Sequence, residues 1–318
     1  MNSLYNLLKH LGVFKIPKEM NFETIASELK ESKVQSGKYI GISETTQKKY
    51  LQKLNYLFER TDVDGLLDVL NSFDNINSRI TYFTAVLGSR KHSQTFARAI
   101  QNVFESINTA YMELLSSNKE TIKTEVKSER EKAAWVDWKD ILKQVPKAPK
   151  TGDSMTQEQV LLAFYTLIPP VRLDYNALSI VQYPATIEKG NYLQIQNKNK
   201  MSLILTEYKT SETYGATTIV VPTRLCKIIN SYLETMPKKK FLFSPKGSLD
   251  KPFKTAESFG AYLRDTLKAI FEKPLTIDIL RHSYITWLKR NDVSSSKKKK
   301  AAKIMGHSLE MQEAYVKE

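Results

Sequence analysis

Cysteine is almost absent from this sequence, because Cys226 is the only one among 318 residues. A single cysteine excludes an internal disulfide and a thiolate-bound metal cluster, and it favours an intracellular, reducing compartment. Long apolar runs are also missing, since no stretch approaches the roughly 20 residues needed to cross a bilayer. The first residues lack the basic start and the cleavage site of a secretory signal. We therefore expect an intracellular protein with no membrane partner.

Acidic residues are scarce relative to basic ones. Forty-eight Lys and Arg against 34 Asp and Glu give a formal net charge of +14 and a pI near 9.5. This excess favours a polyanionic partner, most often nucleic acid, because basic groups release counterions from phosphates. The alternative is a generically basic soluble protein. Membrane-surface binding is disfavoured, because no helical segment combines a basic face with a dense Trp, Phe and Leu face.

The motifs of several enzyme classes are lacking as well. The sequence has no GxxxxGK[ST] phosphate loop, no HExxH metal motif and no Gly-x-Ser-x-Gly nucleophile elbow. Its carboxylates form no obvious metal-binding cluster. A hydrophobic fraction of 41%, with 16 Tyr and 13 Phe, excludes a fully disordered chain. The length is sufficient for two domains and a sizeable core.

Hydrophobic periodicity divides the chain into four segments. Residues 1–40 predict a small helical N-terminal appendage, with DNA-arm binding as a candidate role. Residues 41–116 predict an all-helical bundle, whose strongest apolar stripe runs from Phe96 to Leu114 over about five turns. Residues 117–153 are polar and end in proline and glycine, which is typical of a linker. Residues 154–318 mix helical and strand patterns.

The predicted linker contains two tryptophans, Trp135 and Trp138. We expect both to pack on a neighbouring domain, since indole rings more often belong to cores and interfaces. The alternative is stacking on a nucleotide.

The last segment predicts a domain that is mainly α with a small antiparallel sheet, an α+β fold. It opens on a capping box, Thr156 with Gln159, and Pro169-Pro170 end the helix that follows. A turn is expected at Glu212 to Gly215. Strands are predicted at 192–195, 203–205 and 217–221, and helices at 225–236, 259–271, 277–290 and around Ala301.

Five dispersed residues of this segment could serve phosphodiester cleavage and rejoining: Arg172, Lys209, Arg281, His307 and Tyr315. A phosphoryl centre under attack gains negative charge, which guanidinium, ammonium and imidazole groups stabilise by donating hydrogen bonds. A tyrosine hydroxyl can act as the nucleophile. Each residue taken singly is weak support, so the interpretation depends on their combination and order.

The surroundings of each residue bear on its role. Arg172 follows a helix end, and its alternative is a surface pairing with Asp174. Arg281 lies at the edge of an apolar helix face, so it is partly sheltered and needs an anion or a carboxylate. Lys209 ends a strand before a tight turn, where its ammonium could protonate a leaving oxygen; the alternative is a solvated hairpin lysine. His307 could equally cap a helix.

In this order the residues resemble the motifs of the tyrosine recombinase (phage-type integrase) family. The stretches that carry the resemblance are Ile-Pro-Pro-Val-Arg-Leu-Asp-Tyr, Tyr-Lys-Thr-Ser-Glu-Thr-Tyr-Gly, Ile-Leu-Arg-His-Ser-Tyr and Met-Gly-His-Ser-Leu-Glu-Met-Gln-Glu-Ala-Tyr. They cover residues 155–318 at motif level, and residues 43–115 are similar to the family's helical core-binding domain. The first two stretches resemble the branch found in large DNA viruses, virophages and related mobile elements.

The resemblance implies a site-specific recombinase or integrase that cleaves and rejoins DNA through a 3′-phosphotyrosine. Arg172 and Arg281 would hold the scissile phosphate, and Lys209 would be the general acid at the leaving 5′ oxygen. His307 would hydrogen-bond the phosphate or assist proton transfer, and Tyr315 would attack. The covalent linkage conserves the phosphodiester energy, so no cofactor is implied, neither ATP nor a metal.

The resemblance also implies partners and a setting. Proteins of this family typically wrap double-stranded DNA between their two domains and assemble as homotetramers on two duplexes. A member of the branch named above would be encoded by a virus or mobile element and would act wherever host DNA is.

Two features depart from the family's pattern. Asp278 lies three residues before Arg281, where the family usually has His or Lys, and an ionised carboxylate cannot donate a proton. The neighbouring His282 is a candidate to compensate. The interval from His307 to Tyr315 is eight residues, one shorter than usual.

Two further points stay open at the level of sequence. The lysine run, Lys297, Lys298, Lys299 and Lys300, is a candidate for non-specific DNA phosphate contacts, with a solvated mobile loop as its alternative. The alternative functions are a type IB-like DNA topoisomerase, which reseals the same strand, and a catalytically inactive DNA-binding relative, which Asp278 favours.

Overall fold

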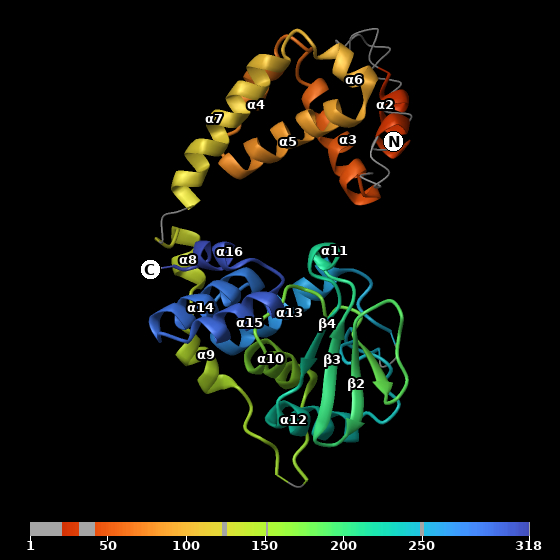
Figure 1. Cartoon of the computed structure of the whole chain (residues 1–318), viewed down its shortest axis with the longest axis vertical. Coiled ribbons are helices and arrows are strands. Elements are labelled where there is room, and N and C mark those ends of the chain that lie inside the picture. The colour runs from red at the N-terminus through yellow and green to blue at the C-terminus, as the bar shows by residue number, and fades with distance from the viewer. Residues whose placement is uncertain (1–20, 32–41, 123–125, 151, 249–250, 318) are drawn as a thin grey trace. The chain divides into compact units, whose positions relative to one another are not determined.

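A computed structural model describes residues 21–31, 42–122, 126–150, 152–248 and 251–317 (Figure 1). The chain divides into two compact units, Met1–Lys123 and Thr124–Glu318, and each has its own hydrophobic core. The first is helical and the second combines helices with one small sheet, so the predicted fold class is confirmed. None of the described helices is both long and apolar enough to cross a membrane.

Helices alone make up the described part of the first unit. They are α2 (Phe22–Glu31), α3 (Glu44–Phe58), α4 (Leu66–Asn71), α5 (Ile76–His92), α6 (Gln94–Ala99) and α7 (Phe104–Ile122). The stripe predicted as one helix from Phe96 to Leu114 is in fact two. The chain leaves helical geometry at Ile100 (φ −101°, ψ 12°), and α6 and α7 both turn buried residues toward the same core.

The predicted appendage of residues 1–40 differs from the structure where it is described. Ile25 and Leu29, one turn apart on α2, are buried in the core of the first unit. The Glu28 carboxylate accepts hydrogen bonds from Ser93 and Thr95 at the start of α6. Helix α2 is therefore part of the helical bundle. The rest of that segment, and with it the proposed arm-binding role, lies outside the described residues.

The second unit follows the predicted order of elements with additions. Its helices are α8 (Glu129–Ala134), α9 (Trp138–Gln144), α10 (Gln157–Leu167), α11 (Ser211–Tyr214), α12 (Thr223–Glu234), α13 (Ala256–Phe271), α14 (Ile277–Arg290), α15 (Ser295–Met305) and α16 (Leu309–Ala314). The expected turn at 212–215 contains the short helix α11. The capping box of Thr156 with Gln159 is confirmed at the start of α10.

The sheet of this unit is mixed rather than antiparallel. Its strands are β1 (Ser179–Gln182), β2 (Tyr192–Asn197), β3 (Lys200–Leu205) and β4 (Thr217–Val220), in that spatial order. Strands β2, β3 and β4 pair antiparallel as predicted, but β1, which was not predicted, runs parallel to β2. The loop between β1 and β2 carries the chain back to the same end of the sheet before β2 begins, so the two strands share a direction (Figure 1).

The segment predicted as a linker, residues 117–153, is mostly structured. Helix α7 extends to Ile122, the unit boundary falls after Lys123, and α8 and α9 belong to the second unit. Trp138 is buried against Tyr284 of α14, with ring centroids 4.8 Å apart, and Trp135 is buried beside it. The packing interpretation of both tryptophans is confirmed. Charged residues interleave with these apolar ones, which is why the segment reads as a linker in sequence.

Candidate active site

Arg281 is fully buried on the inner face of α14. Its Nη1 donates to the Pro170 carbonyl at 2.9 Å, and its Nη2 donates to the Met305 carbonyl and to His307 Nδ1, both at 3.3 Å. Its Nε has no partner among the described residues. Burial, followed by the charge of Arg172, lowers its pKa. A guanidinium stays protonated in proteins, so this buried group is a cation with a donor to spare.

Arg172 follows Val171 directly after the two prolines that end α10, and it is half-buried. The Tyr165 hydroxyl donates to its carbonyl at 2.7 Å, and the Asp174 carboxylate accepts its backbone N–H at 3.1 Å. Asp174 therefore contacts the backbone of Arg172, where the sequence suggested a surface ion pair. Arg281 donates to the carbonyl of Pro170, two residues before Arg172. The charge of Arg172 also contributes to the lowered pKa of Arg281, after burial, and of His307, after burial and Arg281.

Asp174 lies in the same environment as the arginines. Burial raises the pKa of the Asp174 carboxyl. Among the contacts that lower this pKa, the charge of Arg172 has the largest effect. A carboxylate held in this way stabilises the backbone conformation that presents Arg172, and it partly balances the two cations.

His307 comes directly after a left-handed turn that ends α15. Gly306 has φ +66° and ψ 46°, and a Cβ there would lie 2.8 Å from Thr210 Oγ1. The His307 ring is 6% exposed and its Nδ1 accepts from Arg281, so the ring proton is on Nε2. That Nε2 is buried and has no partner among the described residues. Burial first, then the charges of Arg281 and Arg172, lower the pKa of His307 to about 4.

Lys209 is exposed between β3 and α11, in the connection that leads to β4. Its neighbour Thr210 donates a hydrogen bond from Oγ1 to the Gly306 carbonyl at 3.0 Å. The Tyr208 hydroxyl donates to the Gly215 carbonyl at 2.7 Å and closes the same connection. The Lys209 turn is thereby attached to the residue that precedes His307.

Tyr315 terminates α16 and is half-buried. Its ring centroid lies 5.4 Å from that of His307 and 5.7 Å from the Arg281 guanidinium carbon. The ring of His282 stacks on it at 4.5 Å with an interplanar angle of 18°, and His282 Nδ1–H donates to the Tyr315 carbonyl at 2.6 Å. Burial lowers the pKa of His282, so this ring is a neutral support for the tyrosine.

The other predicted residues have different positions. Asp278 is exposed in the first turn of α14, where a negative charge favours the positive end of the helix dipole. Lys297, Lys299 and Lys300 are exposed and Lys298 is half-buried on the first turns of α15. The alternative of a mobile loop is therefore wrong, because the lysine run is helical.

The structure brings Arg172, Arg281, His307 and Tyr315 into one cluster, and Thr210 joins the Lys209 turn to it. Sequence reasoning missed Thr210 and the backbone roles of Tyr165 and Asp174. The contact from Thr210 to Gly306 spans 96 residues, so no local pattern could reveal it. Among the described residues, no three His, Cys, Asp or Glu side chains are grouped to hold a metal ion.

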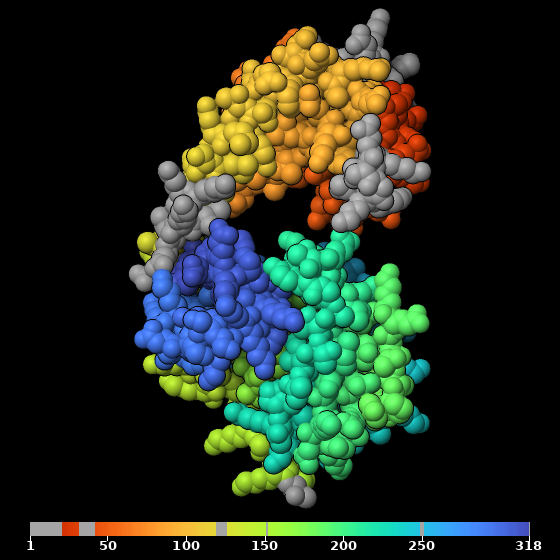
Figure 2. Space-filling view, viewed as in Figure 1, coloured from red at the N-terminus to blue at the C-terminus, as the bar shows by residue number. Residues whose placement is uncertain are grey.

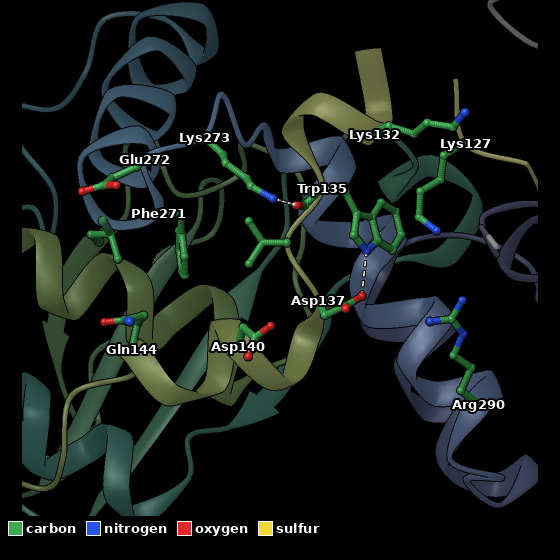
Figure 3. Close-up of a pocket in the computed structure, with 12 residues that line it drawn as sticks. Lys127, Lys132, Trp135, Asp137, Asp140, Gln144, Phe271, Glu272, Lys273 and Arg290 are labelled. Atoms are coloured by element: carbon green, nitrogen blue, oxygen red, sulfur yellow. Dashed lines mark hydrogen bonds between the residues drawn. The ribbon is translucent and has the colours of Figure 1, made fainter. Parts of the chain in front are cut away.

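A separate hollow of about 650 Å³ lies between α8, α9 and the ends of α13 and α14 (Figure 3). None of the clustered residues lines it. Trp135 Nε1 donates to the Asp137 carboxylate, and Lys273 donates to the Trp135 carbonyl, both at 2.8 Å. Its charges are of both signs, so it offers no preference for an anion. Its contacts instead fix the α8–α9 joint to the rest of the unit.

Comparisons with known proteins give distant similarities. No family model and no curated protein matches the sequence. The chain is similar to the crystal structure of XerA recombinase, at 15% identity and a TM-score of 0.38, over 92% of this chain and 93% of that one. It is similar to a variant of protelomerase TelA covalently complexed with substrate DNA, at 14% identity and a TM-score of 0.44, over 93% of this chain and 94% of that one. It is also similar to selenomethionine protelomerase TelA covalently complexed with substrate DNA, at 16% identity and a TM-score of 0.41, over 93% of each chain. Values this low carry no functional assignment.

Proposed function

We propose that this chain is a DNA strand transferase of the tyrosine recombinase kind, a site-specific recombinase or integrase that works through a 3′-phosphotyrosine. The observation that supports it is a cluster of two guanidiniums, a buried imidazole and a tyrosine, in which Arg281 Nε and His307 Nε2 are unpaired donors. A buried donor without an acceptor is costly, by about 1–3 kcal/mol. The oxygens of a phosphodiester would satisfy both donors.

Each residue then has a role that its environment suits. Arg172 and Arg281 bind the non-bridging oxygens and stabilise the charge that develops on them. His307 is neutral near pH 7 because its pKa is about 4, and it donates through Nε2–H. The Tyr315 hydroxyl gives its proton to solvent water, and its oxygen bonds to phosphorus as the bond to the 5′ oxygen breaks. Lys209 supplies a proton to that leaving oxygen.

The residues that depart from the family's pattern take supporting roles in this proposal. His282 contacts Tyr315 through ring stacking and a hydrogen bond to its carbonyl, so it orients the nucleophile. Asp278 is exposed in the first turn of α14, so it stabilises the helix that carries Arg281 and takes no part in proton transfer. Both residues act through their neighbours.

The partner is double-stranded DNA. The net charge of +14 supplies phosphate contacts beyond the cluster, and Lys298 and Lys299 of α15 are among the groups that make them. The helical first unit is the core-binding domain and the second unit is the catalytic domain. Assembly as a homotetramer on two duplexes, and an origin in a virus or mobile element, complete the proposal on the strength of the sequence motifs.

The test is formation of a covalent adduct. Duplexes that bind the chain are first selected from a randomised pool and are then nicked beside the cleavage position, so that the released fragment diffuses away. We expect a denaturant-resistant protein–DNA adduct with the wild-type chain and with Tyr183→Phe, a matched change at a tyrosine that is 58% exposed. Tyr315→Phe gives none.

The outcomes separate the alternatives. An adduct in Tyr315→Phe moves the nucleophile to another residue. Binding without an adduct in the wild-type chain favours a DNA-binding relative without catalysis. Adducts that reseal only onto the original strand, with no transfer to a second duplex, favour a topoisomerase.

A further inference from the structure

A groove of about 650 Å³ runs along the outer edge of the sheet in the second unit. One wall is the segment Ala216–Val220, which contains β4, and the opposite wall is formed by Tyr284 and Trp287 of α14 and Ala301 and Ile304 of α15. In Figure 2 the blue surface of the C-terminal helices adjoins the green surface that carries β4. The groove contains none of the clustered residues assigned to strand transfer.

The edge of β4 offers unpaired backbone groups to this groove. Strand β4 is the last in the sheet, and no described strand pairs with its outer side. Val221 N–H donates to the Met201 carbonyl across the β3–β4 pair at 3.0 Å. Hydrogen bonds alternate along an antiparallel pair, so the N–H and C=O of Thr218 and Val220 point outward. The Val220 side chain is 77% exposed.

Positive charge borders the groove on the side of α15. Lys297, Lys300 and Lys303 line it, and no described Asp or Glu does. Lys297 lies in the first turn of α15, where a cation opposes the helix dipole, whereas Lys303 lies in the last turn, where a cation favours it. The first turn of α15 has no acidic residue, and the Ser294 side chain makes no cap hydrogen bond. No described acidic residue balances the three lysines within the groove, so their charge suits an external anion.

We propose that this groove binds an extended acidic segment of a partner protein, which adds to β4 as a further strand. Its backbone would pair with Thr218 and Val220, its apolar side chains would contact Trp287 and the neighbouring apolar wall, and its carboxylates would face the lysines of α15. Addition of a strand to a free sheet edge is a recurrent mode of peptide recognition. A DNA duplex would interact with the lysines, but it would leave the strand edge and the apolar wall without a partner.

The experiment uses a random library of twelve-residue peptides displayed on phage and selected on the full chain. Selected peptides are synthesised with a fluorophore, and their affinities are measured by anisotropy. We expect sequences that alternate apolar residues with Asp or Glu, since alternate side chains of a strand face opposite sides. Affinity should fall at least tenfold in Val220→Pro, which removes an outward N–H at an edge position that tolerates proline.

A charge variant keeps the test independent of that backbone change. Lys300→Glu should also weaken the selected peptides at least tenfold. Lys299→Glu is the matched control, because Lys299 is exposed on the same helix and does not line the groove. Thermal unfolding of each variant verifies that it folds.

Three results would overturn the proposal. One is selection of no peptide, or of peptides whose affinity neither variant changes. Another is that Lys300→Glu lowers the affinity for duplex DNA more than Lys299→Glu does and leaves the affinity for the peptides unchanged. That result would assign the groove lysines to DNA. The third is self-association of the chain that Val220→Pro abolishes, which makes a second copy the occupant. The proposal does not depend on strand-transfer activity, so its failure leaves that function unaffected.

Discussion

The hydrogen bond from Thr210 to the Gly306 carbonyl should control how well Lys209 is placed for proton transfer. It attaches the Lys209 turn to the residue before His307, at 3.0 Å. Thr210→Val removes the hydroxyl and leaves the shape of the side chain almost unchanged. The Gly306 carbonyl is then buried without this donor, which costs about 1–3 kcal/mol. At about 1.4 kcal/mol per factor of ten, docking of the turn falls roughly five- to a hundredfold.

The assay compares two leaving groups in single-turnover cleavage of a selected duplex. One substrate has the ordinary 5′ oxygen, and the other has sulfur at that bridging position. A thiolate leaves without a proton, since thiols ionise near pH 8.5 and alcohols far above that. We expect Thr210→Val and Lys209→Ala to slow the oxygen substrate and to leave the sulfur substrate near the wild-type rate. Thr213→Val, at an exposed threonine of α11, should change neither.

Equal slowing of both substrates by Thr210→Val would refute this reasoning, because the defect would not lie in protonation of the leaving group. An unchanged rate on the oxygen substrate would show that the contact does not place Lys209. Failure of the sulfur substrate to rescue Lys209→Ala is a different result. It would show that Lys209 is not the general acid, so that Thr210 could not act by placing it for proton transfer.

Four more predictions concern the cluster itself. Arg281→Lys should slow cleavage by about a hundredfold to a thousandfold, because it loses donors aimed at the phosphate, with little loss of duplex affinity in a filter-binding assay; equal losses would make Arg281 a binding residue. The pKa of His307, about 4 in the free chain, should rise on duplex binding in an NMR titration, because a phosphate stabilises the imidazolium; no rise would place the phosphate elsewhere. Since this folded-state pKa lies below the ordinary 6.5, His307 also contributes stability that is lost as pH falls from 6.5 toward 4. Gly306→Ala should destabilise the fold by about 1–2 kcal/mol in chemical denaturation, because its φ is +66° and a Cβ would meet Thr210; an unchanged midpoint would contradict the tight turn.

Local signals account for the elements that the sequence predicted well. The capping box at Thr156 and the apolar stripe of α14 are each formed by residues close together in the sequence. Helices α10 and α14 both begin where expected. Strand β1 and helices α8 and α9 escaped prediction because each is short. In α8 and α9 the apolar residues, such as Trp138, are interspersed with charged ones, so their burial depends on partners distant in sequence.

The candidate site shows the same division. The types and order of Arg172, Lys209, Arg281, His307 and Tyr315 are visible in the sequence, because each lies in a recognisable stretch. The arrangement of these five residues in space is not visible in the sequence. Arg281 was expected at the edge of a buried face and is fully buried, since carbonyls of two other segments accept hydrogen bonds from its Nη1 and Nη2. Contacts of that kind arise only when separate elements pack together.

The most direct test of the central claim is to identify the atom that holds the DNA. The denatured adduct is digested with trypsin and nuclease, and the modified peptide is sequenced by mass spectrometry. We predict a nucleotide joined through its 3′ phosphate to Tyr315. Attachment to any other residue, or through a 5′ phosphate, would contradict the assignment of this cluster as the centre of strand transfer.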